Sequence, residues 1–287
     1  MSSSSTSTGT SASTATPTDP LGRFTSPSAA YEAGRPSYPP EAITALLAGL
    51  APAAQLTVAD VGAGTGISTR VLAATGARVL AIEPNAAMRE KGVARQQQAA
   101  AAGSSERIEW IDATGEECAA LPDASVDLSV AFQAWHWVNH DTALREQQRI
   151  VRAGGRIAVV YNERDETEAT GDAFTRAVGD VFRAYAIDGT EALRETTRLR
   201  FAAIPGAVSL QFGNRQWLDA AGLRARFDSA SFLPRADTEA GARMHAEVAA
   251  LFERFARAGG DAAAAAEDAT PRVCVRYATH VVYVGRE

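Results

Sequence analysis

The chain has 287 residues with a hydrophobic fraction of 46%, which suits one large globular domain. Its 28 Lys and Arg residues against 34 Asp and Glu residues give a net charge of −6, so no broad cationic surface is expected for a nucleic acid or an anionic membrane. Two cysteines, Cys118 and Cys274, exclude a disulfide framework and lack the spacing of a zinc site, which predicts a reducing, cytoplasmic location and no bound metal.

The first twenty residues are rich in serine and threonine and carry no Lys or Arg, and Asp19 is their one charged residue. A secretory signal needs a basic start and an apolar core, and transit peptides are rich in arginine, so neither pattern is present. We expect residues 1–23 to be a disordered tail and residues 24–287 to be the folded domain. The uncharged stretch 42–59 is interrupted by Pro52, so no membrane-spanning helix is predicted.

From about residue 24 onward, short runs of β-branched residues alternate with stretches rich in alanine and leucine. This alternation is typical of an α/β fold, in which helices cover a parallel sheet. In chain order, the expected strands are 56–61, 78–82, 108–111, 126–132 and 156–161. The expected helices between them are 67–75, 88–98 and 141–151, and the pair of glycines at 154 and 155 is expected to end the third.

After Asn162 the alternation lapses for about fifty residues, which is too long for a loop within a compact domain. We predict a helical insertion at about 166–222, outside a core of 56–162, that covers a substrate cavity. Two more strands are expected at 223–230 and 273–284, and a helix is expected between them at 240–258. The acidic, alanine-rich stretch 261–268 is interpreted as a surface linker.

A glycine-rich turn, DVGAGTG at 60–66, lies between the first strand and its helix. Glycine there lets the backbone approach a ligand closely and points the amides of the helix N-terminus at it. A dinucleotide motif requires a small residue three positions after Gly64, where this chain has Ile67. An acid at the end of the second strand, Glu83, suits the ribose hydroxyls of either a dinucleotide or another nucleoside, although a solvated helix cap is the alternative.

Five segments together resemble a known family. The segments 60–66 and 81–88 (AIEPNAAM) resemble the nucleoside-binding half of class I S-adenosylmethionine-dependent methyltransferases. The segment 31–39 (YEAGRPSYP) is similar to the N-terminal motif of a small-molecule branch related to trans-aconitate methyltransferases. The segments 132–137 (FQAWHW) and 160–165 (VYNERD) resemble those that follow the fourth and fifth strands in that branch.

The resemblance implies a Rossmann-like, seven-stranded, mostly parallel sheet with helices on both faces and an antiparallel last strand. It implies S-adenosyl-L-methionine as the cofactor, with the glycines at its methionine portion, Glu83 at the ribose, and Asp112 at the adenine. Tyr31 and Arg35 are expected to fold over the cofactor, where a guanidinium suits a carboxylate. The full set of implied cofactor-binding residues is Tyr31, Arg35, Asp60, Gly62, Gly64, Gly66, Glu83, Pro84, Met88, Asp112, Ala113 and Gln133.

His136 is the best candidate for a catalytic base, because it follows the fourth strand at the edge where such sheets bind ligands. The alternative is that it belongs to an aromatic cluster with its two tryptophan neighbours. A second alternative is that the tryptophans at 110, 135 and 137 form a cage for a cation, although Trp110 fits a core position. A carboxylate acceptor would need a bidentate cation, for which the available residues are Arg35, Arg164 and Arg215.

Taken together, these patterns predict a methyltransferase that moves a methyl group from S-adenosylmethionine to a small-molecule acceptor, at an oxygen such as a carboxylate or hydroxyl. A nicotinamide-dependent (NAD) oxidoreductase is one alternative, which the isoleucine at position 67 disfavours. A protein that binds S-adenosylmethionine without catalysis is the other. No nucleic-acid or membrane partner is expected.

Overall fold

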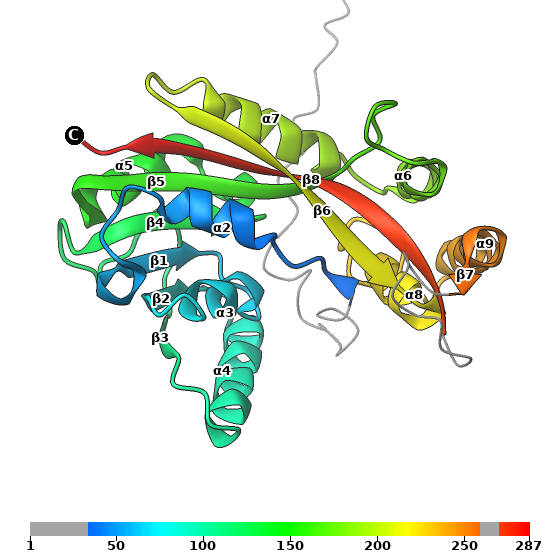
Figure 1. Ribbon diagram of the computed structural model, residues 1–287, viewed down its shortest axis with the longest axis horizontal. Helices are drawn as coiled ribbons and strands as arrows, with labels where there is room; N and C mark the ends of the chain where they lie inside the picture. The colour runs from blue at the N-terminus through cyan, green and yellow to red at the C-terminus, as the bar shows by residue number, and fades with distance from the viewer. Residues whose placement is uncertain (1–33, 259–269) are drawn as a thin grey trace, which may run out of the picture.

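The computed structural model describes residues 34–258 and 270–287 (Figure 1). The predicted tail at 1–23, Tyr31 and the predicted linker at 261–268 lie outside the described residues.

One mixed sheet forms the centre of the fold. Seven strands follow one another in the order β3 (Arg107–Ile111), β2 (Arg78–Ile82), β1 (Thr57–Val61), β4 (Val126–Phe132), β5 (Val151–Arg164), β8 (Pro271–Gly285) and β6 (Val208–Leu218). The strands from β3 to β5 are parallel, whereas β8 runs antiparallel to both of its neighbours. The short β7 (Arg257–Ala258) pairs with β8 beside this path. This arrangement confirms the expected α/β fold.

Helices cover both faces of the sheet (Figure 1). One face packs against α2 (Pro40–Leu47) and α3 (Ile67–Ala73), and the other packs against α5 (His140–Ile150) and α7 (Thr190–Ala202). Successive strand residues point to opposite faces, so Val281 of β8 joins the first core and Val282 joins the second. Apolar residues at nearly every position of the central strands are therefore buried, which explains their continuous hydrophobic runs.

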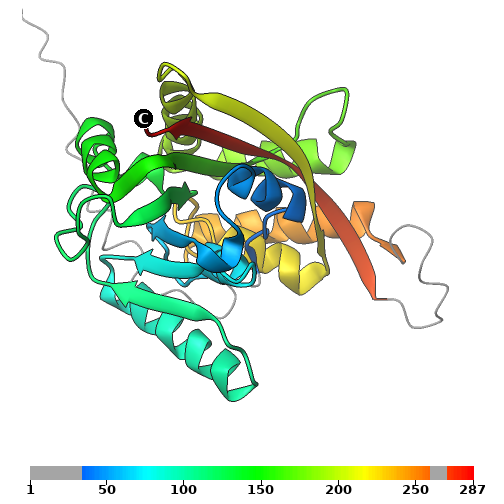
Figure 2. The same ribbon diagram turned by 60° about the vertical axis from the view of Figure 1, so that its left-hand side comes forward.

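A second group of helices gathers where β6 and β8 extend beyond the parallel strands (Figures 1 and 2). These are α6 (Ala173–Tyr185), α8 (Ala220–Asp228) and α9 (Glu239–Phe255), which share an apolar core with the end of β8. Phe182 and Phe227 stack there with ring centroids 4.5 Å apart. This group of helices lies near the carboxyl ends of the parallel strands, and α8 contributes to the cavity described below.

Side-chain caps define where several helices begin. In each of them a side-chain oxygen accepts from a backbone N–H of the first turn, as expected for an N-cap. The caps are Asn85 for α4 (Ala86–Ala101), Asn139 for α5, Asp172 for α6, Asp219 for α8 and Thr238 for α9.

Two predicted elements after the fifth strand are corrected by the structure. The span 223–230, predicted as a strand, lies largely in α8, whose capping residue Asp219 stands before it. The missing strand is β6, so the helices of the predicted insertion, α6 and α7, end at Ala202. β6 is an edge strand whose residues alternate between exposed and half-buried. Because it has few buried apolar residues, its sequence lacks the hydrophobic run by which the other strands were predicted.

The prediction that the glycines at 154 and 155 end the third helix is wrong. Helix α5 ends at Ile150, and both glycines lie within β5, which begins at Val151. Among the described residues, no helix is long and apolar enough to cross a membrane.

Candidate active site

A cavity of about 320 Å³ opens at the carboxyl ends of β1 and β4. These neighbouring strands are the point at which the strand order reverses, since the chain runs outward from β1 to β3 and then returns to β4. Open α/β sheets bind their ligands at such a switch point. The predicted site residues that line the cavity are Arg35, Gly62, Gly64, Glu83, Pro84, Met88 and Gln133.

The glycine turn after β1 adopts a backbone that only glycine accommodates easily. Gly62, Gly64 and Gly66 have φ angles of 71°, 60° and 84°. A Cβ atom on Gly62 would lie 2.5 Å from the Cβ of Ala134, so the turn is pressed against the segment after β4. Gly66 stands before α3, and its side faces the Trp110 ring and not the cavity.

Glu83, at the end of β2, is joined to the glycine turn. Its Oε2 accepts a 2.8 Å hydrogen bond from the N–H of Gly64, and its Oε1 accepts one of 2.8 Å from the N–H of Asn85. The residue is 7% exposed, and burial raises the pKa of its carboxyl despite these two bonds. Glu83 is thus not a solvated helix cap, because Asn85 caps α4. Its remaining lone pairs are free to accept from hydroxyl donors in the cavity.

Asp60 lies fully buried beneath the turn and does not line the cavity. Its Oδ2 accepts hydrogen bonds from Ser68 at 2.8 Å and Thr69 at 2.6 Å, which fix the first turn of α3 to the end of β1. Its Oδ1 is enclosed and has no hydrogen-bond partner among the described residues. Burial outweighs the two hydroxyl donors and raises the pKa of Asp60 to about 6.

Gln133 follows β4 in a left-handed backbone conformation, with φ at 56°. Non-glycine residues adopt this region rarely, and such strain tends to occur at functional sites. Its amide Nε2 donates to the carbonyl of Asn162 at 2.9 Å, which fixes the end of β4 to the end of β5. Its Oε1 is buried without a partner in the described part of the chain, so an acceptor remains available beside the cavity.

The loop after β3 contributes Thr114, Gly115 and Glu116 to the cavity. Asp112 precedes these residues, but its side chain is 69% exposed and pairs with Arg89 at 2.8 Å. Ala113 packs against the core and does not line the cavity.

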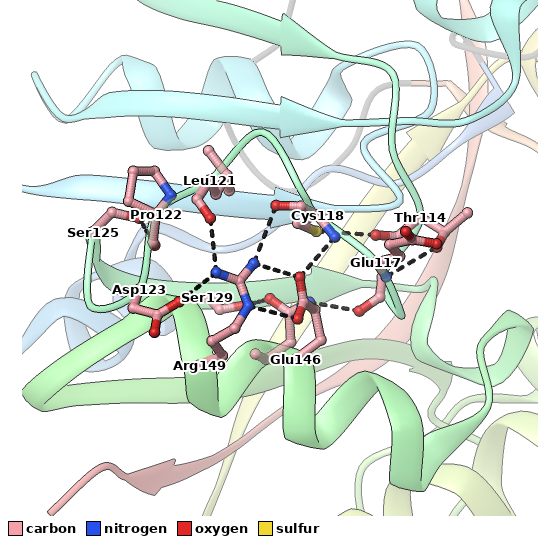
Figure 3. A network of polar contacts seen from close by, with 12 residues as sticks. Thr114, Glu117, Cys118, Leu121, Pro122, Asp123, Ser125, Ser129, Glu146 and Arg149 are labelled. Atoms are coloured by element: carbon pink, nitrogen blue, oxygen red, sulfur yellow. Dashed lines mark hydrogen bonds and ion pairs between the residues drawn. The ribbon is translucent and has the colours of Figure 1, made fainter.

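Three side chains of α5 hold this loop in place, and Figure 3 shows two of them, Glu146 and Arg149. The Arg149 guanidinium donates to the carbonyls of Leu121 and Cys118 and to Glu146, whose Oε1 in turn accepts from the Cys118 N–H at 2.7 Å. Buried Gln147 donates to the carbonyl of Gly115 at 2.7 Å. The shape of this cavity wall therefore depends on α5.

His136 lies in η3 (Trp135–Trp137), buried against Trp137 and Tyr161 at centroid distances of 4.7 and 6.0 Å. Neither ring nitrogen has a hydrogen-bond partner among the described residues. Burial, followed by the charges of Arg194 and Arg35, holds the pKa of His136 well below its usual range, so the imidazole is neutral. His136 itself does not line the cavity.

The three tryptophans do not share one cage. Trp137 lines the cavity, whereas Trp135 is buried and donates to Nδ1 of His140 at 3.1 Å. Trp110 packs against Gly92 of α4, where an added Cβ would lie 2.0 Å from its ring.

The arginines at the cavity differ from those expected. Arg35 lines it, but Arg164 pairs with Glu166 and Glu191, and Arg215 is exposed on β6. The cavity is lined in addition by Arg194 of α7 and Arg226 of α8, which sequence reasoning missed. The one signal for Arg226 was its place between two apolar neighbours, Ala225 and Phe227, and nothing in the sequence distinguished Arg194 from the other arginines of α7.

Comparison with known proteins identifies the central part of the chain. Residues 59–159 match the family model of the methyltransferase domain. An uncharacterized methyltransferase of Mycobacterium tuberculosis is 44% identical over 144 residues, which cover 50% of this chain and 53% of that protein. A protein of Saccharomyces cerevisiae described as a probable S-adenosylmethionine-dependent methyltransferase is 28% identical over 131 residues, or 46% of this chain and 44% of its own.

The match thus spans about half the length of these curated relatives. The solved structure of a candidate type II methyltransferase from Anaeromyxobacter dehalogenans has the same fold, with a TM-score of 0.62 and 22% identity over 88% of this chain and 97% of that one. The segment that matches the methyltransferase domain, residues 59–159, includes the glycine turn, Glu83 and Gln133.

Proposed function

We propose that the chain, built around this domain, is an S-adenosyl-L-methionine-dependent methyltransferase that modifies an oxygen of a small-molecule acceptor. The observation that carries the proposal is the hydrogen bond between Glu83 and Gly64 at the mouth of the cavity. It joins the two features that a nucleoside cofactor needs, a glycine turn for close approach and an acid for ribose hydroxyls, within the matched methyltransferase segment.

The polar groups at the site fit the cofactor. Glu83 holds the ribose through the lone pairs that its backbone donors leave free. Gln133 Oε1, a buried acceptor without a partner in the described ranges, suits the ammonium group, and Arg35 suits the carboxylate. Tyr31 stays a predicted cofactor contact. Asp60, Gly66, Asp112 and Ala113 do not line the cavity, so their predicted cofactor contacts have no support from its geometry, and Asp60 and Gly66 support the turn from beneath instead.

The bound cofactor supplies an activated methyl group on a sulfonium. The protein has to align the acceptor with it and exclude water, which is mainly a matter of position. An acceptor oxygen that is already an anion needs no base. A hydroxyl acceptor needs one, and His136 stays the predicted base. Its imidazole is neutral and both of its nitrogens lack partners among the described residues, but it does not line the cavity and its lowered pKa makes it a weak proton acceptor.

The alternative of a nicotinamide-dependent oxidoreductase is weakened by Ile67. This residue opens α3 and lines the cavity where a dinucleotide motif requires a small residue for close packing. The alternative of a non-catalytic binding protein is weakened by the extent of the cavity, which continues past the glycine turn to Trp137, Asn162 and Arg194. Relation to the trans-aconitate branch rests on the sequence motifs and stays a prediction.

The test is methyl transfer from tritiated S-adenosylmethionine to a panel of small organic acids, phenols and alcohols. We expect label in an ester or ether product and release of S-adenosylhomocysteine. The variant His136→Asn separates the two interpretations of His136. Loss of turnover with retained cofactor binding assigns it the proton, whereas full turnover makes it structural. Binding of the cofactor without transfer to any acceptor would contradict an enzymatic role.

A further inference from the structure

Three arginines from separate parts of the chain meet at the cavity. Arg35 precedes α2, Arg194 lies on α7 and Arg226 lies on α8. All three side chains line the same cavity, and the positive charge of Arg35 acts on both Arg194 and Arg226. Arg226 is 6% exposed as a residue, and the Nε of Arg194 is enclosed without a hydrogen-bond partner in the described part of the chain.

Arg194 and Arg226 differ from the other buried arginines near them. Arg164 pairs with Glu191 at 2.6 Å and Arg198 pairs with Glu163 at 2.7 Å, so each of these cations has a carboxylate. Among the described residues, neither Arg194 nor Arg226 forms an ion pair. Arg226 donates to the Tyr277 hydroxyl at 3.1 Å, and Arg194 lies over the Phe232 ring at 5.3 Å.

Neither of these contacts places a negative charge against the two guanidinium groups. Burial, with repulsion from Arg35 and Arg226, lowers the pKa of Arg194 to about 10. Burial also lowers the pKa of Arg226, and Arg35 adds to this. A buried charge without a counter-ion is destabilising, so groups of this kind are normally paired.

The bound cofactor does not supply the missing negative charge. S-adenosylmethionine carries an ammonium and a sulfonium against one carboxylate, so it adds a net positive charge to the cavity. The acids that line the cavity are Glu83 and Glu116. The Glu83 carboxylate accepts a hydrogen bond from the Gly64 N–H of the turn, and the Glu116 carboxylate accepts one from the Asn139 N–H at 2.7 Å.

We infer that the acceptor carries an oxyanion, a carboxylate or a phosphate, which Arg194 and Arg226 bind and which is distinct from the methylated atom. This inference rests on the proposed methyltransferase function. It makes Arg194 and Arg226 the residues that determine specificity, and it leaves Arg35 for the carboxylate of the cofactor. Small neutral alcohols and phenols are poor acceptors, because they would leave both guanidinium groups unpaired.

The position of Arg194 is fixed by the ion pairs of α7. Glu191, one turn before it, pairs with Arg164 of β5, and Arg198, one turn after it, pairs bidentately with Glu163 of β5 at 2.7 and 3.1 Å. The two pairs fasten the helix to the sheet on both sides of Arg194. Such preorganisation reduces the entropy lost when an anion binds.

The test measures anion binding on the chain saturated with S-adenosylhomocysteine, by calorimetric titration with malonate, inorganic phosphate and uncharged malonamide. Arg194→Gln and Arg226→Gln are compared with Arg200→Gln and Arg224→Gln, which remove exposed arginines from the same two helices. Arg194→Lys retains the charge and shows whether charge alone suffices. Titration of S-adenosylhomocysteine into each variant identifies any that fails to fold.

We expect malonate or phosphate to bind while malonamide does not, and the stronger anion identifies the class of oxyanion. Each Gln variant of the cavity arginines should weaken that binding about tenfold or more, as expected for a charge-assisted hydrogen bond, while the two exposed controls match the wild type. Two results would overturn this inference while leaving the proposed function intact, provided that S-adenosylhomocysteine still binds. One is that malonamide binds as tightly as the anions, and the other is that both cavity variants bind the anions as tightly as the wild type does. Failure of S-adenosylhomocysteine to bind would overturn the proposed function with it.

Discussion

The carboxylate of Glu83 accepts a hydrogen bond from the backbone N–H of Gly64 at 2.8 Å, although the two residues follow different strands. β1 and β2 pair in parallel through to Val61 and Ile82, so the turn and the acid emerge side by side. The acid therefore orients the turn as well as presenting its free lone pairs to the cavity. Four predictions follow from this part of the site and its supports.

Replacing Glu83 with Ala removes both the orienting bond to Gly64 and the acceptor for the ribose. We expect affinity for S-adenosylhomocysteine to fall about 100-fold, since two hydrogen bonds to a charged group are lost. The matched control is Glu90→Ala, which removes an exposed acid from α4 and should leave affinity within twofold, or about 0.4 kcal/mol. Calorimetric titration measures both. Equal affinities in the two variants would show that Glu83 has no part in binding.

Gly62→Ala tests the close approach of the turn to the segment after β4. The added Cβ would stand 2.5 Å from that of Ala134 at a φ of 71°, so both strain and overlap oppose it. Gly103→Ala has a φ of 94° with nothing within 4 Å, so it carries strain alone. We expect losses of unfolding free energy of about 3 kcal/mol and about 1 kcal/mol respectively, measured by urea denaturation. Losses of the same size would mean that the turn and Ala134 are not in contact.

Asp60 gives the stability of the chain a definite pH dependence. Its pKa is raised to about 6 in the folded state from an ordinary value of 3.8, so between these values the folded chain holds a proton that the unfolded chain has released. Its contribution therefore destabilises the fold as the pH rises through this window, by at most about 3 kcal/mol.

Asp60→Asn keeps the shape and removes the titration. The unfolding free energy of the wild type minus that of Asp60→Asn should fall from about pH 4 to about pH 7. Urea denaturation at several pH values across the window measures this difference. A difference that stays constant with pH would show that Asp60 has no raised pKa.

Arg149→Gln should loosen the cavity wall formed by the loop after β3. The Arg149 guanidinium donates hydrogen bonds to the carbonyls of Cys118 and Leu121, and these contacts hold the loop against α5 (Figure 3). We expect faster amide exchange in residues 114–121 and about tenfold weaker binding of S-adenosylhomocysteine. Arg145→Gln, one turn earlier and exposed on the same helix, is the control. Unchanged exchange in the loop would mean that other contacts hold it.

The parts of the site that could be predicted from sequence are those in which motif and position coincide locally. The glycine turn, Glu83 and Gln133 all follow directly after strands, and parallel strands bring their carboxyl ends to one edge. The place of these residues in the wall of the cavity therefore follows from the parallel arrangement of the strands.

Arg194 and Arg226 could not be predicted in this way. They lie on α7 and α8, so their place depends on how those helices pack against β5 and the end of β8. The same dependence explains the error at 223–230, which was predicted as a strand and lies largely in α8. In α8, Leu223 and Phe227 are buried in the core that this helix shares with α9 and β8, so tertiary packing decides the secondary structure here.

The most direct test of the account is calorimetric titration of the purified chain with S-adenosylhomocysteine, with NAD as the comparison ligand. Micromolar binding of S-adenosylhomocysteine, about −8 kcal/mol, together with no heat from NAD, is the predicted result. Binding of NAD without S-adenosylhomocysteine would contradict the methyltransferase assignment and return the glycine turn to the dinucleotide class.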